Sequence, residues 1–180
     1  MKKQNTLEKD TIVVTVMSNL GFDVMAKQNG INVVKTKVGD RYVLEDMLKN
    51  GYVIGGEQSG HVILLKYNTT GDGMLTAIKL LEVLKATGEK ASSLASIMDV
   101  YPQVLKNAKV KNENKYKYLE DEVIKSICDE LEKEFKNEGR VLIRPSGTEP
   151  LIRVMIEGKD EEYITKKATM LAKVVEERLG

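Results

Sequence analysis

The sequence predicts an α/β protein, in which a mostly parallel α/β sandwich domain is followed by a smaller α+β domain with the order strand, helix, strand, strand, helix. Residues 11–16 form an almost continuous run of β-branched apolar side chains, which is typical of a strand buried on both faces of a parallel sheet. Helical and strand-like patterns then alternate up to about residue 100. We therefore expect two domains, residues 1–100 and residues 101–180.

Most elements of the first predicted domain have a start or stop signal beside them. Ser18 and Asn19 can cap a helix over residues 20–29, and Gly30 can end it. A polar turn at 69–73 precedes a strongly amphipathic helix that ends at Gly88. The remaining elements are strands at 31–38, 52–54 and 61–66, a helix at 41–50, a short helix near 93–98 and a linker around 99–103.

The second predicted domain surrounds a loop at residues 144–150. A strand near 104–111 leads through a polar turn to a helix over 119–135, which Gly139 would end. Strands at 141–143 and 151–157 flank the loop, and a helix over 160–179 begins with acidic residues that suit the helix dipole. The expected core stripes are Val123, Ile127, Leu131 and Phe135 on the first helix, and Ile164, Ala168, Leu171, Val175 and Leu179 on the second.

Composition limits the classes of protein to which the chain can belong. Among 180 residues 42% are apolar and 31% are charged, but the formal net charge is only +1. A nucleic-acid-binding protein would normally carry a clear basic excess, so we expect no nucleic-acid partner. The single cysteine, Cys128, is interpreted as a core residue. Because the chain has neither a long apolar run nor the pattern of a signal peptide, we expect a cytoplasmic protein without a membrane partner.

The 144–150 loop has the composition of a phosphate site. Arg144, together with Arg153 in the strand beyond, offers planar guanidinium groups that match phosphate oxygens. No Gly-Lys-Ser/Thr sequence follows, so this is not a Walker loop. The alternative is a rigid hairpin loop with two solvated arginines. Further donors would be two hydroxyl groups and the backbone N–H groups around a glycine, in Ser146, Gly147 and Thr148.

The 56–61 loop holds the only histidine of the chain and would suit a sugar. Glu57, Ser59 and His61 alternate, so in an extended segment they would share one face. A carboxylate, a hydroxyl and an imidazole then offer acceptors and donors to neighbouring sugar hydroxyls. The alternative is a hairpin turn whose lone histidine is satisfied within the fold.

The junction at residues 37–42 gives a weaker functional signal. Arg41 would lie at the start of a helix, where the dipole disfavours a cation unless it has a partner. Asp40 is interpreted as the N-cap of that helix. The turn at 70–73 carries one carboxylate, Asp72, which is too few for a metal site, and is interpreted as a turn and helix cap.

Taken together, several of these segments resemble the α-D-phosphohexomutases. The two principal motifs are Gly-Glu-Gln-Ser-Gly-His at 56–61 and Arg-Pro-Ser-Gly-Thr-Glu-Pro-Leu-Ile-Arg at 144–153. Within this family the resemblance is closest to the phosphoglucosamine mutase branch. It rests on Gln58 and on the segments at 16–21, 38–43 and 69–73. The resemblance extends from about residue 11 to residue 180 and covers only the third and fourth of the family's four domains.

The resemblance implies an isomerase, an intramolecular phosphotransferase of amino-sugar and peptidoglycan-precursor metabolism. Glu57 and Ser59 would bind sugar hydroxyls with His61 beside them, while Asp40 and Arg41 would be further residues of the cleft. The phosphate group that does not react would be held by Arg144, Ser146, Gly147, Thr148 and Arg153.

The catalytic serine and the magnesium loop of this family lie in its first two domains, and neither motif occurs in this sequence. We therefore expect no catalytic residue and no metal ligand here, and Mg²⁺ only in the full-length enzyme. The fragment alone would be inactive, and its partners would be the missing N-terminal domains and a hexosamine phosphate; the full-length protein could form a homodimer. Two alternatives stay open: a phosphoglucomutase or phosphomannomutase specificity, and a non-catalytic module that binds sugar phosphates.

Overall fold

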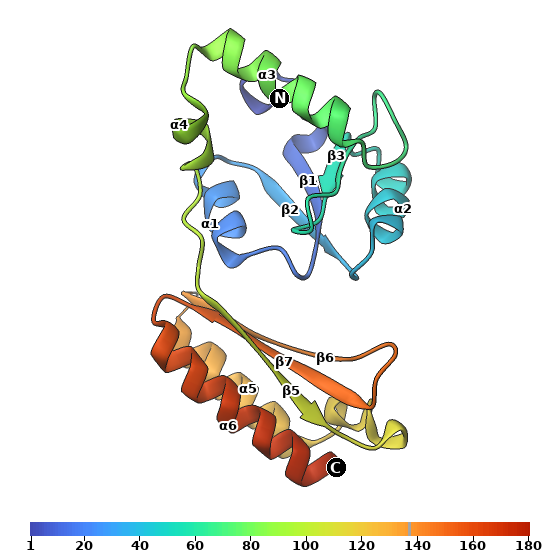
Figure 1. The fold of residues 1–180 in the computed structure, drawn as a ribbon, viewed down its shortest axis with the longest axis vertical. Helices are drawn as coiled ribbons and strands as arrows, with labels where there is room; N and C mark the ends of the chain where they lie inside the picture. The colour runs from blue at the N-terminus through green and yellow to red at the C-terminus, as the bar shows by residue number, and fades with distance from the viewer. Residues whose placement is uncertain (137) are drawn as a thin grey trace. The chain divides into compact units, whose positions relative to one another are not determined.

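The computed structural model describes residues 1–136 and 138–180, and the chain divides into two compact units, Met1–Val100 and Tyr101–Gly180. Unit 1 contains a four-stranded sheet in the order β2-β1-β3-β4 (Figure 1). Strand β1 is parallel to both β2 and β3, whereas β4 is antiparallel to β3. The expected parallel-rich sheet is thus confirmed. Its strands are β1 (Thr11–Thr15), β2 (Asn32–Thr36), β3 (Ile54–Gly56) and β4 (Val62–Leu64).

The helices of unit 1 are α1 (Leu20–Gln28), α2 (Asp40–Asn50), α3 (Gly73–Thr87) and α4 (Ala91–Ala95). The core cluster here is small, with Val13, Val43, Met47 and Ile63 buried between α2 and the sheet. Strand β3 lies two residues later than predicted because Gly55 belongs to it. A Cβ at Gly55 would approach side-chain atoms of Val43 and Met47 to 2.6 Å, so this glycine lets α2 pack closely on the sheet.

Side-chain caps begin α1 and α3 as expected, but not α2. The Asn19 carboxamide accepts a hydrogen bond from the backbone N–H of Gly21 at 3.0 Å, and Asp72 accepts one from Leu75 at 2.9 Å. The prediction that Asp40 caps α2 is wrong. The N-cap is Gly39, whose φ of 130° suits glycine, and Asp40 is the first helical residue.

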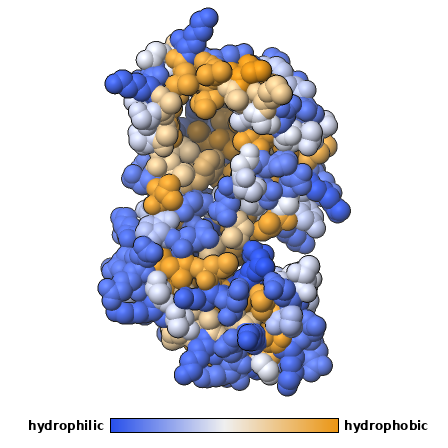
Figure 2. Space-filling model, viewed as in Figure 1, coloured by the Kyte–Doolittle hydropathy of each residue, from blue (hydrophilic) through white to orange (hydrophobic). Residues whose placement is uncertain are grey.

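Helix α3 has the expected amphipathic spacing, yet none of its residues is buried. Met74, Ile78 and Leu81 are 79%, 52% and 62% exposed, respectively. Figure 2, drawn from the same direction as Figure 1, shows hydrophobic side chains gathered over this helix. The apolar stripe of α3 is therefore available on the surface of unit 1. No helix within the described ranges is long and apolar enough to cross a membrane.

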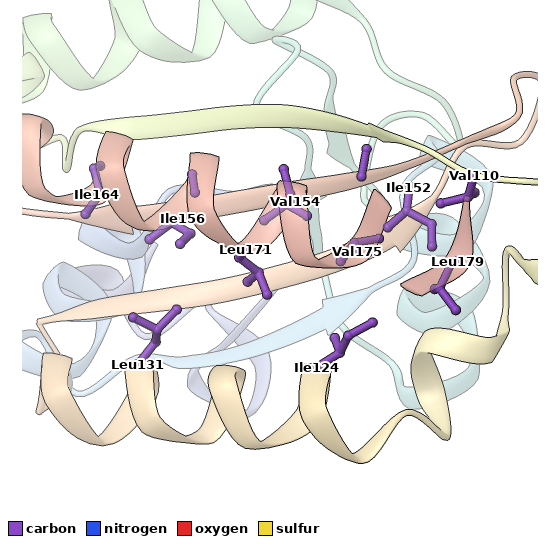
Figure 3. Packing of buried hydrophobic residues seen from close by; sticks show 13 residues of the cluster. Val110, Ile124, Leu131, Ile152, Val154, Ile156, Ile164, Leu171, Val175 and Leu179 are labelled. Atoms are coloured by element: carbon purple, nitrogen blue, oxygen red, sulfur yellow. The ribbon is translucent and has the colours of Figure 1, made fainter. Parts of the chain in front are cut away.

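Unit 2 is a three-stranded antiparallel sheet in the order β5-β7-β6 (Figure 1). Side chains of α5 and α6 join those of the strands in one core cluster (Figure 3). All five residues predicted for the last helix are at most 4% exposed, which confirms its stripe. The elements are β5 (Gln103–Lys109), α5 (Glu122–Phe135), β6 (Gly139–Pro145), β7 (Leu151–Gly158) and α6 (Glu161–Leu179).

The predicted stripe of α5 is wrong at its first position. Asp121 caps the helix by accepting hydrogen bonds from Val123 and Ile124, both at 3.0 Å, so α5 begins three residues later than expected. Ile124 is only 1% exposed, whereas Val123 is 43% exposed. One residue corresponds to 100° around a helix, so the two neighbours cannot share a face. Gly139 opens β6 and does not end the helix, which ends at Phe135 and is followed by Lys136 in the left-handed conformation.

Cys128 lies at the edge of this core. Its side chain is half-buried and packs against the cluster, as predicted. Burial, together with the charges of Glu132 and Asp129, raises the pKa of the thiol from 9.0 to about 11. The thiolate is therefore disfavoured near neutral pH, and the cysteine serves packing.

Candidate functional site

Strands β6 and β7 place two arginines opposite each other at the base of the 144–150 loop. Their antiparallel register pairs Arg144 directly with Arg153. Like charges in directly opposed positions destabilise a strand pair. Burial, together with the charge of Arg153, lowers the pKa of Arg144 below its ordinary value. A bound anion would relieve this repulsion, so the strand pairing itself favours an anion at this position.

Glu149 supplies negative charge to this pair within the loop. Its Oε2 lies 3.3 Å from Nη2 of Arg153. The carboxylate is half-exposed, so solvent screens this ion pair, and its contribution is small. Glu149 can therefore be displaced by an anion that contacts both arginines.

The backbone of the loop leaves two donors available. Ser146 is only 4% exposed; its N–H donates to the carbonyl of Leu151 at 2.9 Å, and its Oγ accepts from the N–H of Glu149 at 3.2 Å. Within the described part of the chain, the N–H groups of Gly147 and Thr148 donate no hydrogen bond. Both residues are exposed, and consecutive unpaired N–H groups form the kind of nest that binds anions.

A buried lysine beneath the loop was missed by the sequence analysis. Lys115 is only 9% exposed, and its Nζ donates to the backbone carbonyl of Ser146 at 2.8 Å. Lysine is rarely buried, and nothing in the local sequence separates this residue from its solvated neighbours. Residues 109–117 hold four lysines at closely spaced positions: Lys109, Lys111, Lys115 and Lys117.

The 56–61 loop of unit 1 is tied to the start of α2 through Glu57. Its Oε1 accepts a hydrogen bond from the N–H of Gly39 at 2.9 Å. The loop is closed by a bond from the N–H of Glu57 to the carbonyl of His61 at 2.9 Å. Gly60, with φ of 96°, makes the reversal of the chain in a conformation that L-residues rarely adopt.

The side chain of His61, at the end of the 56–61 loop, faces the start of α2. Its Nε2 is 3.4 Å from Oδ2 of Asp40, close enough for an ion pair when the imidazole is protonated. The geometry is not that of a hydrogen bond, and Nε2 has no other hydrogen-bond partner in the described residues. The imidazole also contacts Gly71, where any Cβ would lie 2.3 Å from the ring. Nε2 itself is buried and closed to a ligand in this conformation, although 39% of the His61 side chain is exposed.

The structure brings together some of the predicted sugar-site residues and not others. Asp40, Glu57 and His61 form one cluster. Ser59 is exposed at the tip of the loop, with no recorded side-chain partner among the described residues. Arg41 is exposed and turns to Oε1 of Glu45, 3.0 Å from its Nε, which gives it the partner that a cation at a helix start needs.

The described residues offer no metal site. No group of three or more His, Cys, Asp or Glu side chains in residues 1–136 and 138–180 could hold a metal ion. The carboxylates nearest the two loops are engaged instead with Arg153 and with the backbone of Gly39.

Two family models cover almost the whole chain. The model described as phosphoglucomutase/phosphomannomutase, alpha/beta/alpha domain III, matches residues 1–101, and that of the C-terminal domain, domain IV, matches residues 105–174. The chain belongs to the phosphohexomutase family. The resemblance inferred from the motifs at 56–61 and 144–153 is thereby confirmed.

Curated relatives point to one branch of the phosphohexomutases. The chain is 69% identical to a phosphoglucosamine mutase of Acetivibrio thermocellus and 65% identical to one of Ruminiclostridium cellulolyticum, each over all 180 residues. A phosphoglucosamine mutase of Caldanaerobacter subterraneus is 60% identical over the same span. In each case the chain spans 40% of the length of the relative.

Solved structures show the same phosphohexomutase fold at low identity. An N-acetylglucosamine-phosphate mutase in its substrate complex aligns with a TM-score of 0.75 and 18% identity, over 97% of this chain and 41% of that one. The Aspergillus fumigatus N-acetylphosphoglucosamine mutase in complex with GlcNAc-6P and magnesium aligns with a TM-score of 0.72 and 15% identity, over 95% of this chain and 39% of that one. These likenesses support the fold of the two units.

Proposed function

We propose that this chain is the sugar- and phosphate-binding part of a phosphoglucosamine mutase, an isomerase that interconverts glucosamine 6-phosphate and glucosamine 1-phosphate. The observation that supports this most strongly is the identity of 60–69% with phosphoglucosamine mutases across the whole length of the chain. Residues 1–100 would be the sugar-binding domain and residues 101–180 the phosphate-binding domain. The enzyme would work in the cytoplasm, in amino-sugar metabolism.

The 144–150 loop would hold the phosphate group that does not react. Arg144 and Arg153 would bind its oxygens by charge-assisted hydrogen bonds, and the N–H groups of Gly147 and Thr148 would complete the site. In such a site the ligand is recognised by its charge. Because a mutase must accept a phosphate on either end of the sugar, a site that reads charge and little else suits the reaction.

The hydroxyl of Ser146 would play a smaller part in this binding than the sequence suggests. Its oxygen already accepts the N–H of Glu149, and the residue is buried under the loop. We infer that Ser146 shapes the loop and that Thr148, which is exposed, offers its hydroxyl to the phosphate.

The 56–61 loop would bind the sugar ring. Glu57 would accept a hydrogen bond from a sugar hydroxyl in exchange for, or in addition to, its bond with Gly39. His61 would contribute the exposed part of its imidazole, and Ser59 would close on the ligand from the loop tip. Asp40 would orient the imidazole of His61, whereas Arg41 would act only if it left Glu45.

Chemistry on the phosphoryl group would fall to the rest of the enzyme. We infer from the family resemblance that a phosphoserine donates the phosphoryl group, that a bisphosphate intermediate is formed, and that Mg²⁺ supports the transfer outside this chain. Positioning and electrostatics dominate phosphoryl transfer, so a chain that only binds and orients the substrate should not turn it over.

A chimaera tests the proposed function. The part of the Acetivibrio thermocellus relative that this chain does not cover would be joined to this chain and assayed with glucosamine 6-phosphate, glucose 6-phosphate and mannose 6-phosphate. We expect kcat/KM to be highest for glucosamine 6-phosphate. A higher value for either other sugar would contradict the specificity, and turnover by the unfused 180-residue chain would contradict the division of labour.

A further inference from the structure

We propose that the buried Lys115 is a positioning residue that fixes the 144–150 loop for anion binding, an inference that rests on the proposed function of that loop. Lys115 follows the short 3₁₀ turn at Asn112–Asn114 and is 9% exposed. Its Nζ donates to the carbonyl oxygen of Ser146 at 2.8 Å, 31 residues away in sequence. The lysine therefore holds one specific peptide group of the loop.

The bond from Lys115 determines where the next backbone donor points. In a trans peptide the C=O of one residue and the N–H of the following residue point in opposite directions. Lys115 holds the carbonyl of Ser146 towards the interior, so the N–H of Gly147 points away from the lysine. Gly147 is exposed and its N–H has no hydrogen-bond partner among the described residues. Lys115 thus turns this donor outward, where a phosphate oxygen can accept it.

The charge of Lys115 favours an anion as well. A buried cation without an opposite charge is costly. Within the described residues no carboxylate pairs with Lys115; its recorded partner is the neutral carbonyl of Ser146. A phosphate at the 144–150 loop would supply the missing negative charge on the other side of the peptide group that Lys115 holds.

Three variants of the 180-residue chain separate this role from a general effect of charge. Lys115→Met removes the ammonium group at similar length, Lys115→Arg keeps a charged donor, and Lys117→Met removes the same charge from an exposed position two residues along. Inorganic phosphate is titrated and the ¹⁵N resonances of Gly147 and Thr148 are followed at a temperature where each variant is folded. Loss of one charge-assisted interaction should weaken phosphate binding about tenfold in Lys115→Met, with the Lys117→Met chain close to the unaltered one. Lys115→Arg should recover most of the affinity.

The outcomes distinguish this inference from the proposed function. If the unaltered chain does not bind phosphate at Gly147 and Thr148, the phosphate site itself is wrong. If the unaltered chain binds phosphate there and Lys115→Met binds it equally well, only the role of Lys115 is overturned. A role confined to stability would lower the melting temperature of Lys115→Met and leave the phosphate affinity of the folded chain unchanged, which would also overturn it.

A measurement on the unaltered chain does not depend on the folding of any variant. The Nζ protons of Lys115 should exchange slowly with water, because the ammonium group is buried and hydrogen-bonded. The ¹⁵Nζ resonance should shift when phosphate saturates the loop. A Lys115 resonance that exchanges as fast as those of exposed lysines, or that stays in place at saturation, would overturn the inference.

Discussion

The two loops are built on scaffolds of unequal strength. In the described residues, the 144–150 loop joins strands of seven and eight residues, backed by a cluster of thirteen buried apolar side chains. The 56–61 loop joins strands of three residues each, over a cluster of four. The 144–150 loop is therefore held by the core beneath it, whereas the 56–61 loop is held mainly by individual polar contacts such as that between Glu57 and Gly39.

This difference suits the ligand groups that we propose for the two loops. A phosphate presents the same charge and shape in either substrate orientation, so a rigid site loses little entropy on binding it. A sugar ring that must be bound from either end presents different hydroxyls each time, so a loop with few fixed contacts can adapt. We therefore expect substitutions in unit 2 to affect stability most, and substitutions at the loops to affect binding most.

The largest effect should come from the core of unit 2. Ile124→Ala should lower the free energy of unfolding by about 3 kcal/mol, because the side chain is buried and leaves a cavity. Its neighbour provides a matched control, since Val123→Ala removes apolar atoms from an exposed position and should cost about 0.5 kcal/mol or less. Urea denaturation monitored by circular dichroism measures both. Equal losses would show that α5 does not face the sheet as described.

A smaller loss is expected in unit 1. Gly55→Ala places a Cβ 2.6 Å from side-chain atoms of Val43 and Met47 and should cost about 2 kcal/mol through overpacking. Gly73→Ala is the control, because no atom lies within 4 Å of a Cβ built there. Thermal denaturation of both variants tests this pair. If Gly55→Ala melts with the unaltered chain, the close packing of α2 on β3 is wrong.

At the 144–150 loop, removal of Arg144 should weaken anion binding without destabilising the chain. Arg144→Met should weaken the binding of inorganic phosphate about tenfold, since one charge-assisted partner is lost. It should not lower the melting temperature of the anion-free chain, because it removes the repulsion between Arg144 and Arg153. Calorimetric titration and melting curves measure the two effects, with Arg41→Met as the control. Unchanged phosphate affinity would exclude Arg144 from the site.

The smallest effect should come from Glu149. Glu149→Gln removes the carboxylate that lies 3.3 Å from Arg153 and should strengthen phosphate binding about threefold, in line with the small value of an exposed ion pair. The gain should vanish at high salt, where screening already weakens that pair. Weaker binding in the variant would mean that Glu149 supports the anion site and does not compete for it.

Patterns that depend on burial periodicity were predicted well from the sequence. The stripe of α6 follows from the fixed period of a helix. The stripe of α5 failed only at Val123, because the cap at Asp121 fixes where the helix begins and a shift of one residue changes the face by 100°. The N-cap of α2 failed because Gly39 takes a backbone conformation that composition does not reveal.

The candidate sites could be recognised from their residue types, but the contacts within them could be found only from the fold. The 144–150 and 56–61 loops stand out because each concentrates donors and acceptors within a few residues. Lys115 did not, because its role depends on a contact with Ser146 across 31 residues. Likewise, Arg41 differs from Arg144 only in its surroundings, a carboxylate one helical turn away in one case and an opposed arginine in the other.

The central proposal is that the 144–150 loop binds a phosphate group and that the 56–61 loop binds a sugar ring. A ¹H–¹⁵N titration of this chain with glucosamine 6-phosphate, run beside glucosamine and inorganic phosphate, tests it directly. We expect glucosamine 6-phosphate and inorganic phosphate to shift the amide resonances of Gly147 and Thr148. Only glucosamine 6-phosphate should shift the amide resonances of Glu57 and His61 as well. Resonances at Gly147 and Thr148 that stay fixed while others move would contradict the account.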